Sequence, residues 1–227
     1  ELLQAIAQEN NLSETAFFVA EQQQYHIRWF TPAAEVDLCG HATLAAAQVI
    51  FNYGQHHQQV IRFTSRSGPL TVTKTEQGML MDFPATMPTK IEPPEHLLSD
   101  GHLGVVEVIA GFDHIIVLEN EQQVLDFQPE LIAWQHLDLR GVVITAPGTD
   151  CDFVSRCFFP KLDVNEDPVT GSAHCQLAPY WAAKLAKNEL TAKQVSQRGG
   201  QILCQVNHDR VELIGQCAEY LKGEIFI

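Results

Sequence analysis

The sequence predicts an α+β protein made of two similar lobes, each a mainly antiparallel sheet around a central helix. Short segments with alternating apolar residues, typical of antiparallel strands, occur in both halves of the chain. The two halves also resemble each other. A strand, a proline loop, a helix that follows a glycine and a turn with arginine and glycine occur twice in the same order. A repeat on this scale indicates a duplicated unit.

The repeat is carried by residues at matching positions. The pairs that lie 128 positions apart are Arg28 with Arg156, Phe30 with Phe158, Pro32 with Pro160, Glu35 with Asp163 and Val36 with Val164. Gly40 then matches Gly171 at an offset of 131. We therefore expect the second copy to carry three extra residues in the loop before its helix.

The first half contains an opening helix, a strand pair, a buried helix and a three-stranded meander. The opening residues ELLQAIAQENN have the pattern of a short amphipathic helix. The other predicted elements are strands at 15–19 and 25–30, a loop at 31–41, an alanine-rich helix at 42–54, and strands at 60–65, 70–74 and 79–84.

Residues 84–95 carry four prolines in twelve residues and form the predicted boundary between the lobes. We expect an N-terminal lobe of residues 1–95 and a C-terminal lobe of residues 96–227, whose last strand can return to the first lobe. The predicted elements of the second lobe are strands at 105–110 and 114–120, a helical segment at 129–137, strands at 141–145 and 152–159, a loop at 166–174, a helix at 176–186, and hairpin strands after residues 194–200.

The chain is acidic, with 28 acidic and 14 basic residues and a formal net charge of −14. Nucleic acids and anionic membranes bind basic surfaces, so we expect neither as a partner. No apolar stretch reaches the roughly 18 residues of a membrane span, and no signal peptide opens the sequence. Six scattered cysteines without a CxxC pair are typical of a reducing cytoplasm.

The sequence also predicts that the protein uses no metal and no organic cofactor. It contains no group of residues with metal-ligand spacing and no GxGxxG motif after a strand. No lysine lies near either of the two helix-start motifs, where it would be needed to form a Schiff base with pyridoxal phosphate.

The junction EDPVTGSAHC, residues 166–175, has two interpretations. Asp and Ser are common N-cap residues, so the stretch can be a capped helix start. It can also be an anion site, because the unpaired N–H groups of a helix N-terminus bind a carboxylate without an arginine. Two pseudo-symmetric lobes favour the anion site, since both helix starts then face one ligand. The residues expected to bind the carboxylate of a small substrate are Gly40, Ala42, Gly171, Ser172 and Ala173.

Three motifs resemble one known family. The segments SETAFFV (13–19), FTPAAEVDLCGHATLAAA (30–47) and EDPVTGSAH (166–174) are similar in sequence and spacing to the PhzF-like family of phenazine-biosynthesis isomerases and epimerases. The resemblance covers nearly the whole chain. It implies the fold of the diaminopimelate-epimerase superfamily, a cofactor-free active site between the lobes, and a homodimer. It also implies a further N-terminal strand and hairpin ahead of Glu1, which this sequence lacks.

The resemblance implies roles for four residues. Glu14 corresponds to the catalytic acid/base, and His41, Asp167 and Ser172 correspond to polar residues around the substrate. Moving a proton between carbons next to a carboxylate needs one positioned base that can return the proton. We expect burial and the charge of Asp167 to raise the pKa of Glu14 toward neutrality, and His41 to donate to the developing negative charge. The expected function is a cofactor-independent isomerase or epimerase of a small carboxylate.

Cys39 keeps other functions open. In diaminopimelate epimerases and proline racemases, two cysteines act as opposing bases just before these helix starts. Cys39 occupies the first place, but Thr170 occupies the second and cannot form a thiolate, which excludes a two-thiol racemase. A lyase of the hydroxyproline-dehydratase kind, pairing Cys39 with Thr170, remains an alternative. A non-catalytic protein that binds a small acid is another, and Cys39 can equally be a small buried residue.

Overall fold

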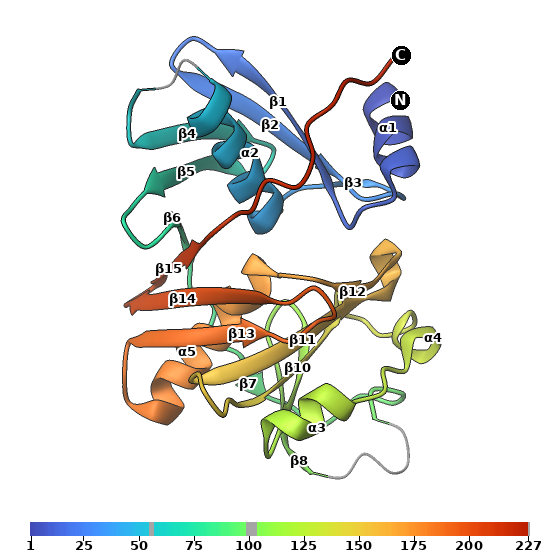
Figure 1. Cartoon of the computed structure of the whole chain (residues 1–227). Coiled ribbons are helices and arrows are strands. Elements are labelled where there is room, and N and C mark those ends of the chain that lie inside the picture. Colours follow the sequence, from blue (N-terminus) through green and yellow to red (C-terminus); the bar gives the residue numbers. More distant parts are fainter. Residues whose placement is uncertain (55–56, 99–103, 227) are drawn as a thin grey trace.

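The computed structural model describes residues 1–54, 57–98 and 104–226 (Figure 1). Its helices are α1 (Leu2–Asn10), α2 (Gly40–Tyr53), α3 (Glu121–Asp126), α4 (Leu131–Trp134) and α5 (Gly171–Leu185), with a 3-10 turn at Pro160–Leu162. The first strands are β1 (Thr15–Glu21), β2 (Gln24–Phe30), β3 (Glu35–Val36), β4 (Val60–Ser65), β5 (Gly68–Lys74), β6 (Met79–Pro84) and β7 (Thr89–Lys90). The others are β8 (Val105–Ala110), β9 (His114–Leu118), β10 (Val142–Pro147), β11 (Phe153–Phe159), β12 (Val164–Asp167), β13 (Glu189–Gln194), β14 (Gly200–Asn207) and β15 (Arg210–Gly215).

These strands form one mixed sheet in the described part of the chain. Its hydrogen-bonded path runs β1-β2-β4-β5-β6-β15-β14-β13-β11-β10-β9-β8-β7, and β3 and β12 pair beside β2 and β11. Most neighbours are antiparallel, and the pairs β2–β4, β9–β10 and β11–β13 are parallel. The central helix α2 contacts β1 and β6, and α5 contacts β13, β14 and β15. The predicted α+β class, with a mainly antiparallel sheet around two central helices, is confirmed.

Strands β6 and β15 join the two halves of the sheet. β15, the last strand of the described chain, runs antiparallel to β6, with Val211 opposite Phe83. In Figure 1, β15 lies between the upper part, which holds α2, and the lower part, which holds α5. The proposed division of the chain at residue 95 stays a prediction.

Both central helices belong to one apolar core. Ala47 and Ile50 of α2 cluster with Leu177 of α5 and with buried residues of the sheet. A second cluster, around Trp134, lies on the opposite face of the lower strands, because successive residues of a strand point to opposite faces. This arrangement buries both faces of β10 and β11, and it leaves the N-termini of α2 and α5 near the junction of the two halves.

The helix α5 begins at Gly171, where the repeat predicts a helix start and ahead of the periodic stretch at 176–186, and it continues through Pro179. Proline has no N–H and leaves the carbonyl four residues earlier without its helical partner. That carbonyl, of Cys175, accepts a hydrogen bond of 2.9 Å from the backbone N–H of Thr86 instead. The proline therefore links the helix to the segment between the two halves.

Other predictions of elements need correction. The helical segment predicted at 129–137 is only the four residues of α4, and α3, β3, β7, β12 and β13 were not predicted. The signal for α3 was its cap, since the side chain of Asn120 accepts from the N–H of Gln123. Residues 216–226 contain no strand, although hairpin strands were expected to the end, because no described strand pairs with them.

The structure also corrects the alignment of the two copies. Arg28 forms a bidentate pair with Glu35, and Arg156 forms the same pair with Glu166. The counterpart of Glu35 is therefore Glu166 and not Asp163. The three extra residues of the second copy form the 3-10 turn before β12.

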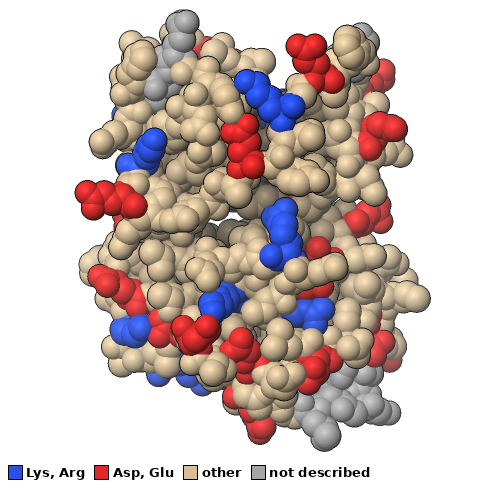
Figure 2. All heavy atoms as spheres, in the orientation of Figure 1, with Lys and Arg blue, Asp and Glu red and all other residues tan. Residues whose placement is uncertain are grey.

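The surface mixes both signs of charge. On the face shown in Figure 2, acidic and basic side chains are interspersed, and the face is hollowed at mid-height between the two halves. Among the described residues, no helix combines the length and the apolar character needed to cross a bilayer.

Candidate active site

The N-termini of α2 and α5 meet at the junction of the two halves. A Cβ atom built on Gly40 would lie 3.5 Å from the Cα atom of Gly171, and the reverse distance is also 3.5 Å. The N-cap residues Cys39 and Thr170 have extended backbones and make no capping hydrogen bond through their side chains. The interpretation of residues 166–175 as a side-chain-capped helix start is therefore wrong. The first N–H groups of α2 and α5 therefore belong to two helix starts that approach each other and have no side-chain cap.

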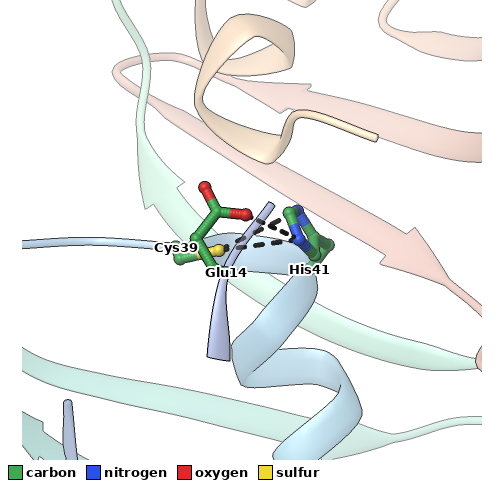
Figure 3. Close-up of side chains that lie close together, drawn as sticks. All are labelled: Glu14, Cys39 and His41. Atoms are coloured by element: carbon green, nitrogen blue, oxygen red, sulfur yellow. Dashed lines mark hydrogen bonds and ion pairs between the residues drawn. The ribbon is translucent and has the colours of Figure 1, made fainter. Parts of the chain in front are cut away.

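Glu14, Cys39 and His41 converge beside these helix starts (Figure 3). Glu14 lies just before β1, and Cys39 and His41 stand on either side of the first residue of α2. The Oε2 atom of Glu14 lies 3.1 Å from Nε2 of His41, and Sγ of Cys39 lies 3.8 Å from each ring nitrogen of His41. Cys39 is buried, and the side chains of His41 and Glu14 are only 20% and 14% exposed. A carboxylate, an imidazole and a thiol thus share one partly enclosed site.

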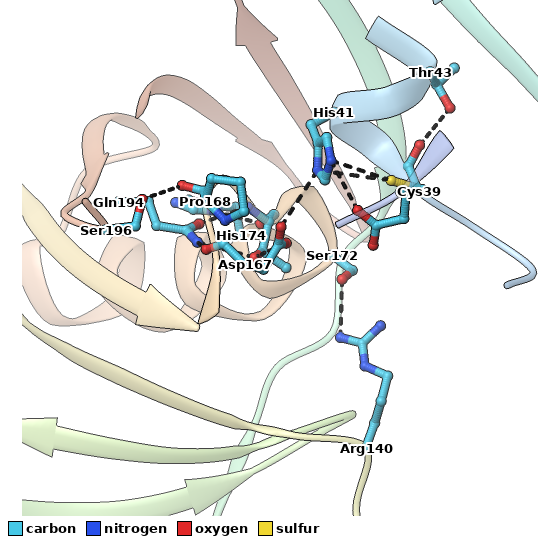
Figure 4. A network of polar contacts seen from close by, with 12 residues as sticks. Cys39, His41, Thr43, Arg140, Asp167, Pro168, Ser172, His174, Gln194 and Ser196 are labelled. Atoms are coloured by element: carbon cyan, nitrogen blue, oxygen red, sulfur yellow. Dashed lines mark hydrogen bonds and ion pairs between the residues drawn. The ribbon is translucent and has the colours of Figure 1, made fainter. Parts of the chain in front are cut away.

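Asp167 approaches the same imidazole from the side of α5 (Figure 4). Its Oδ1 atom lies 4.0 Å from Nδ1 of His41, so the ring stands between two carboxylates. The other oxygen, Oδ2, accepts a hydrogen bond of 2.5 Å from the hydroxyl of Thr170. The Gln194 amide donates to the same hydroxyl at 3.1 Å and to the Asp167 carbonyl at 2.5 Å. These contacts fix the Asp167 side chain and occupy the Thr170 hydroxyl.

The three ionisable groups alter one another's pKa. Burial, assisted by the charge of Glu14, raises the pKa of Asp167 to about 6, although His41 opposes the change. Burial lowers the pKa of His41, but the combined influence of Cys39, Glu14 and Asp167 outweighs it, and the pKa ends well above its ordinary value. Burial likewise raises the pKa of Glu14, but the contact with His41 outweighs it and the pKa is lowered. The expectation of a raised pKa for Glu14 is wrong, because His41 is its nearest charged neighbour.

Ser172 lies in the first turn of α5, and its partner was not predicted from the sequence. Nη2 of Arg140 donates to the Ser172 hydroxyl at 3.0 Å, as Figure 4 shows. The same guanidinium forms a bidentate pair with the fully buried Asp113, at 3.0 and 2.7 Å. Asp113 also accepts from the amide of Gln176 at 2.9 Å. Since Arg140 already donates to the hydroxyl oxygen, the hydroxyl proton is directed toward another acceptor.

Among the remaining predicted binding residues, the backbone is the part that a ligand could reach. The side chains of Ala42 and Ala173 are buried in the core, whereas Gly40 and Gly171 are partly exposed. A ligand at the helix starts would therefore meet N–H groups and the Ser172 hydroxyl, and not the alanine methyl groups.

The same geometry brings together potential metal ligands. Glu14, Cys39 and His41 each offer one ligand atom, and these atoms lie within 4.8 Å of one another. The sequence had indicated no such group, because Glu14 is far from the other two residues along the chain.

A model of the phenazine biosynthesis-like proteins, PhzC-PhzF, matches residues 1–223. The chain belongs to this PhzF family of isomerases. Among its relatives, an uncharacterized isomerase of Pseudomonas aeruginosa is 45% identical over 227 residues, which cover all of this chain and 88% of that protein. An uncharacterized isomerase of Halalkalibacterium halodurans is 44% identical over 231 residues, covering 99% of this chain and 87% of that protein.

Solved structures agree with this membership. A PhzF-family phenazine biosynthesis protein from Enterococcus faecalis has a TM-score of 0.94 and 48% identity, covering 100% of this chain and 87% of its own. A hydroxyproline epimerase from Agrobacterium vitis has a TM-score of 0.57 at 10% identity, covering 89% of this chain and 72% of its own. That identity shows a shared fold alone. The PhzF resemblance, the fold and the enzyme class expected from the sequence are confirmed.

Proposed function

We propose that this PhzF-family enzyme is a cofactor-independent isomerase or epimerase that moves a proton on a small carboxylate-bearing substrate, with Glu14 as the acid/base. One observation carries the proposal. The Glu14–His41–Asp167 series stands where two uncapped helix N-termini meet. This combination offers a base, a cationic donor and an anion site within one small region.

In the proposed reaction, Glu14 removes a proton from a carbon next to the substrate carboxylate. The low pKa of Glu14 keeps it ionised at neutral pH and ready to accept the proton. The electron pair of the broken C–H bond spreads toward the carboxylate, where protonated His41 donates to the growing negative charge. Glu14 then returns the proton to a carbon of the same substrate, so the reaction consumes no other reagent.

The substrate carboxylate is held by the N–H groups at Gly40 and Gly171 and by the Ser172 hydroxyl. Helix N-termini carry partial positive charge, which suits an acidic protein that must still bind an acid. Asp167 balances the charge of His41 and fixes its ring from the other side. These roles rest on the residues' positions and on the family's chemistry.

The proposal also keeps the expected setting of the enzyme. It works without a metal or organic cofactor, as a homodimer, in a reducing cytoplasm and apart from nucleic acids and membranes. The six cysteines are all unpaired, which suits that compartment.

The lyase alternative, which pairs Cys39 with Thr170, has less support from the geometry. The Thr170 hydroxyl donates to Asp167 and accepts from Gln194. Burial raises the pKa of the Cys39 thiol and so disfavours the thiolate that such a lyase needs, although His41 opposes this. The non-catalytic alternative lacks a reason to place a carboxylate, an imidazole and a second carboxylate in series.

Exchange of solvent deuterium into a panel of small carboxylic acids tests the proposal. The wild-type protein should label at least one acid, and Glu14→Gln should reduce the rate roughly 10²- to 10⁴-fold, as expected for a lost general acid/base. Cys39→Ser should keep most of the activity. Glu21→Gln, at the exposed end of β1, is the matched control and should behave as wild type. An active Glu14→Gln beside an inactive Cys39→Ser would transfer the base to the thiol and favour the lyase, and no exchange in any acid would favour a binding protein.

A further inference from the structure

Glu14, Cys39 and His41 are spaced as ligands of a single zinc ion. Nε2 of His41 lies 3.1 Å from Oε2 of Glu14 and 3.8 Å from Sγ of Cys39. In a tetrahedral zinc site, with bonds of about 2.0–2.3 Å, neighbouring donor atoms are roughly 3.4–3.6 Å apart. These two distances differ from that geometry by about 0.3 Å, and all three ligand atoms lie within 4.8 Å of one another. For one ion to bind all three, the side chains rotate until the donor atoms reach the spacing of a tetrahedral site.

Asp167 supplies the outer contact that zinc-binding histidines usually have. Nε2 of His41 faces Oε2 of Glu14 and Nδ1 faces Oδ1 of Asp167 at 4.0 Å, while Sγ of Cys39 lies 3.8 Å from each ring nitrogen. A histidine that binds metal commonly donates its other N–H to a carboxylate, which orients the ring and strengthens the ligand. Asp167 is itself fixed by the hydroxyl of Thr170. The buried oxygens Glu14 Oε2 and Asp167 Oδ1 form no aligned hydrogen bond within the described chain.

We propose that Glu14, Cys39 and His41 form an inhibitory zinc site, with Asp167 orienting the His41 ring. Thiolate and imidazole ligands favour zinc over magnesium and calcium, which prefer oxygen ligands. On binding, the Sγ proton of Cys39 and the Nε2 proton of protonated His41 leave to solvent, and the Glu14 carboxylate provides the third bond. Water takes the fourth position. Each zinc ion therefore releases two protons, and nothing is oxidised or reduced.

Zinc would inhibit the enzyme because it binds the groups that the proposed reaction uses, so the inhibitory effect rests on the proposed function. A Glu14 carboxylate bound to zinc cannot accept a proton from substrate, and a His41 bound through Nε2 loses the N–H that faces Glu14. Zinc binding itself does not depend on the reaction. Zinc binding at this site and the proposed isomerase function can therefore be refuted independently.

The binding test uses the full chain after treatment with a chelator and its removal. Zinc affinity is measured by competition with a chromophoric chelator, and Cd²⁺ is added to a second sample to follow the ultraviolet thiolate-to-metal absorption. We expect one zinc per chain, release of two protons, and a thiolate band. Cys39→Ser should remove the band and weaken zinc by more than about 100-fold, beyond the loss typical of outer contacts, whereas Asp167→Asn should weaken it roughly 10-fold.

Cys151→Ser is the matched control, because Cys151 lies in the turn between β10 and β11 and its thiol contacts the carbonyl of Phe153. It should keep both the band and the affinity. If Cys39→Ser does not fold, as judged by circular dichroism, Glu14→Gln replaces it and should weaken zinc by at least about 10-fold. Zinc binding that persists in these variants, a band that survives Cys39→Ser, or no binding at one ion per chain would overturn the proposal. Zinc bound with these signatures, but no deuterium exchange in any acid, would reject the proposed function and leave the zinc site intact.

Discussion

Asp167→Asn is expected to stabilise the protein at neutral pH, because the site holds a buried carboxylate at an energetic cost. Burial first, and then the charge of Glu14, raises the pKa of Asp167 from 3.8 to about 6. A raised carboxyl pKa means that the folded state retains a proton that the unfolded state has already released. The contribution of this group to stability is therefore full below pH 3.8 and is lost as the pH rises through about 6. At about 1.36 kcal/mol for each pKa unit, the loss at pH 7 approaches about 3 kcal/mol.

Asparagine keeps the shape of the side chain and can still accept from Thr170, so a comparison of two pH values isolates the charge. The free energy of unfolding is measured in urea at pH 4 and pH 8 for the wild type, Asp167→Asn and the surface control Asp82→Asn, whose carboxylate pairs with Arg210. Relative to wild type, Asp167→Asn should gain roughly 2.5 kcal/mol more at pH 8 than at pH 4, where the unfolded carboxyl is already partly ionised. For a chain of this size the gain corresponds to a rise in Tm of roughly 5–10 °C. The same change at both pH values, or a similar gain in the control, would refute the electrostatic reasoning.

Three further outcomes are expected. Burial lowers the pKa of His174 from 6.5 to about 4, so the neutral ring stabilises the fold above pH 6.5, and up to about 3 kcal/mol of stability is lost as the pH falls to 4. His174→Asn should therefore flatten this part of an acid-unfolding curve followed by circular dichroism. An unchanged curve would contradict this prediction. Arg140→Gln should lower the free energy of unfolding by about 2–3 kcal/mol, less than the 3–5 kcal/mol of a fully buried pair, because the Arg140 side chain is 36% exposed. It should also raise KM more than it lowers kcat, because the Ser172 hydroxyl loses its donor. Urea unfolding and steady-state kinetics measure the two effects, and an unchanged KM would argue against the role of Ser172. If Glu14 is the only base, a substrate deuterated at the reacting carbon should carry part of its label into product in ordinary water, as mass spectrometry can show; complete loss of label in a single turnover is the contrary result.

The parts of the fold that sequence could predict are those with a strong local signal. Alternating strands such as β4 and β6, and the two helices that begin at Gly40 and Gly171, follow from periodicity and from the repeat. The path of α5 through Pro179 could not be predicted in this way, because it depends on a hydrogen bond from the backbone N–H of Thr86, a residue far away in the chain. The short strand β12 likewise depends on its pairing with β11 more than on its own residues.

The residues of the candidate site could largely be predicted from the sequence, but the pKa shifts of those residues could not. The motifs predicted Glu14, His41 and Asp167 as site residues, and in the structure His41 lies between the other two. Arg140 carried no local signal, since it precedes β10 and reaches Ser172 only through the fold. The direction of the Glu14 pKa was also beyond the sequence, because burial and the contact with His41 act in opposite directions and only their distances decide which is larger.

The two halves of the site share a backbone design but differ in chemistry. Both helices begin with a glycine after an extended residue, and the first N–H groups of each have no side-chain cap. The side chains at the equivalent N-cap positions differ: Cys39 contacts His41, whereas the Thr170 hydroxyl is held between Asp167 and Gln194 and is not free to act as a base. A racemase with two opposing bases needs a reactive group from each half. The N-cap position of the second half offers no such group here, so the site lacks the two equivalent bases of a two-thiol racemase.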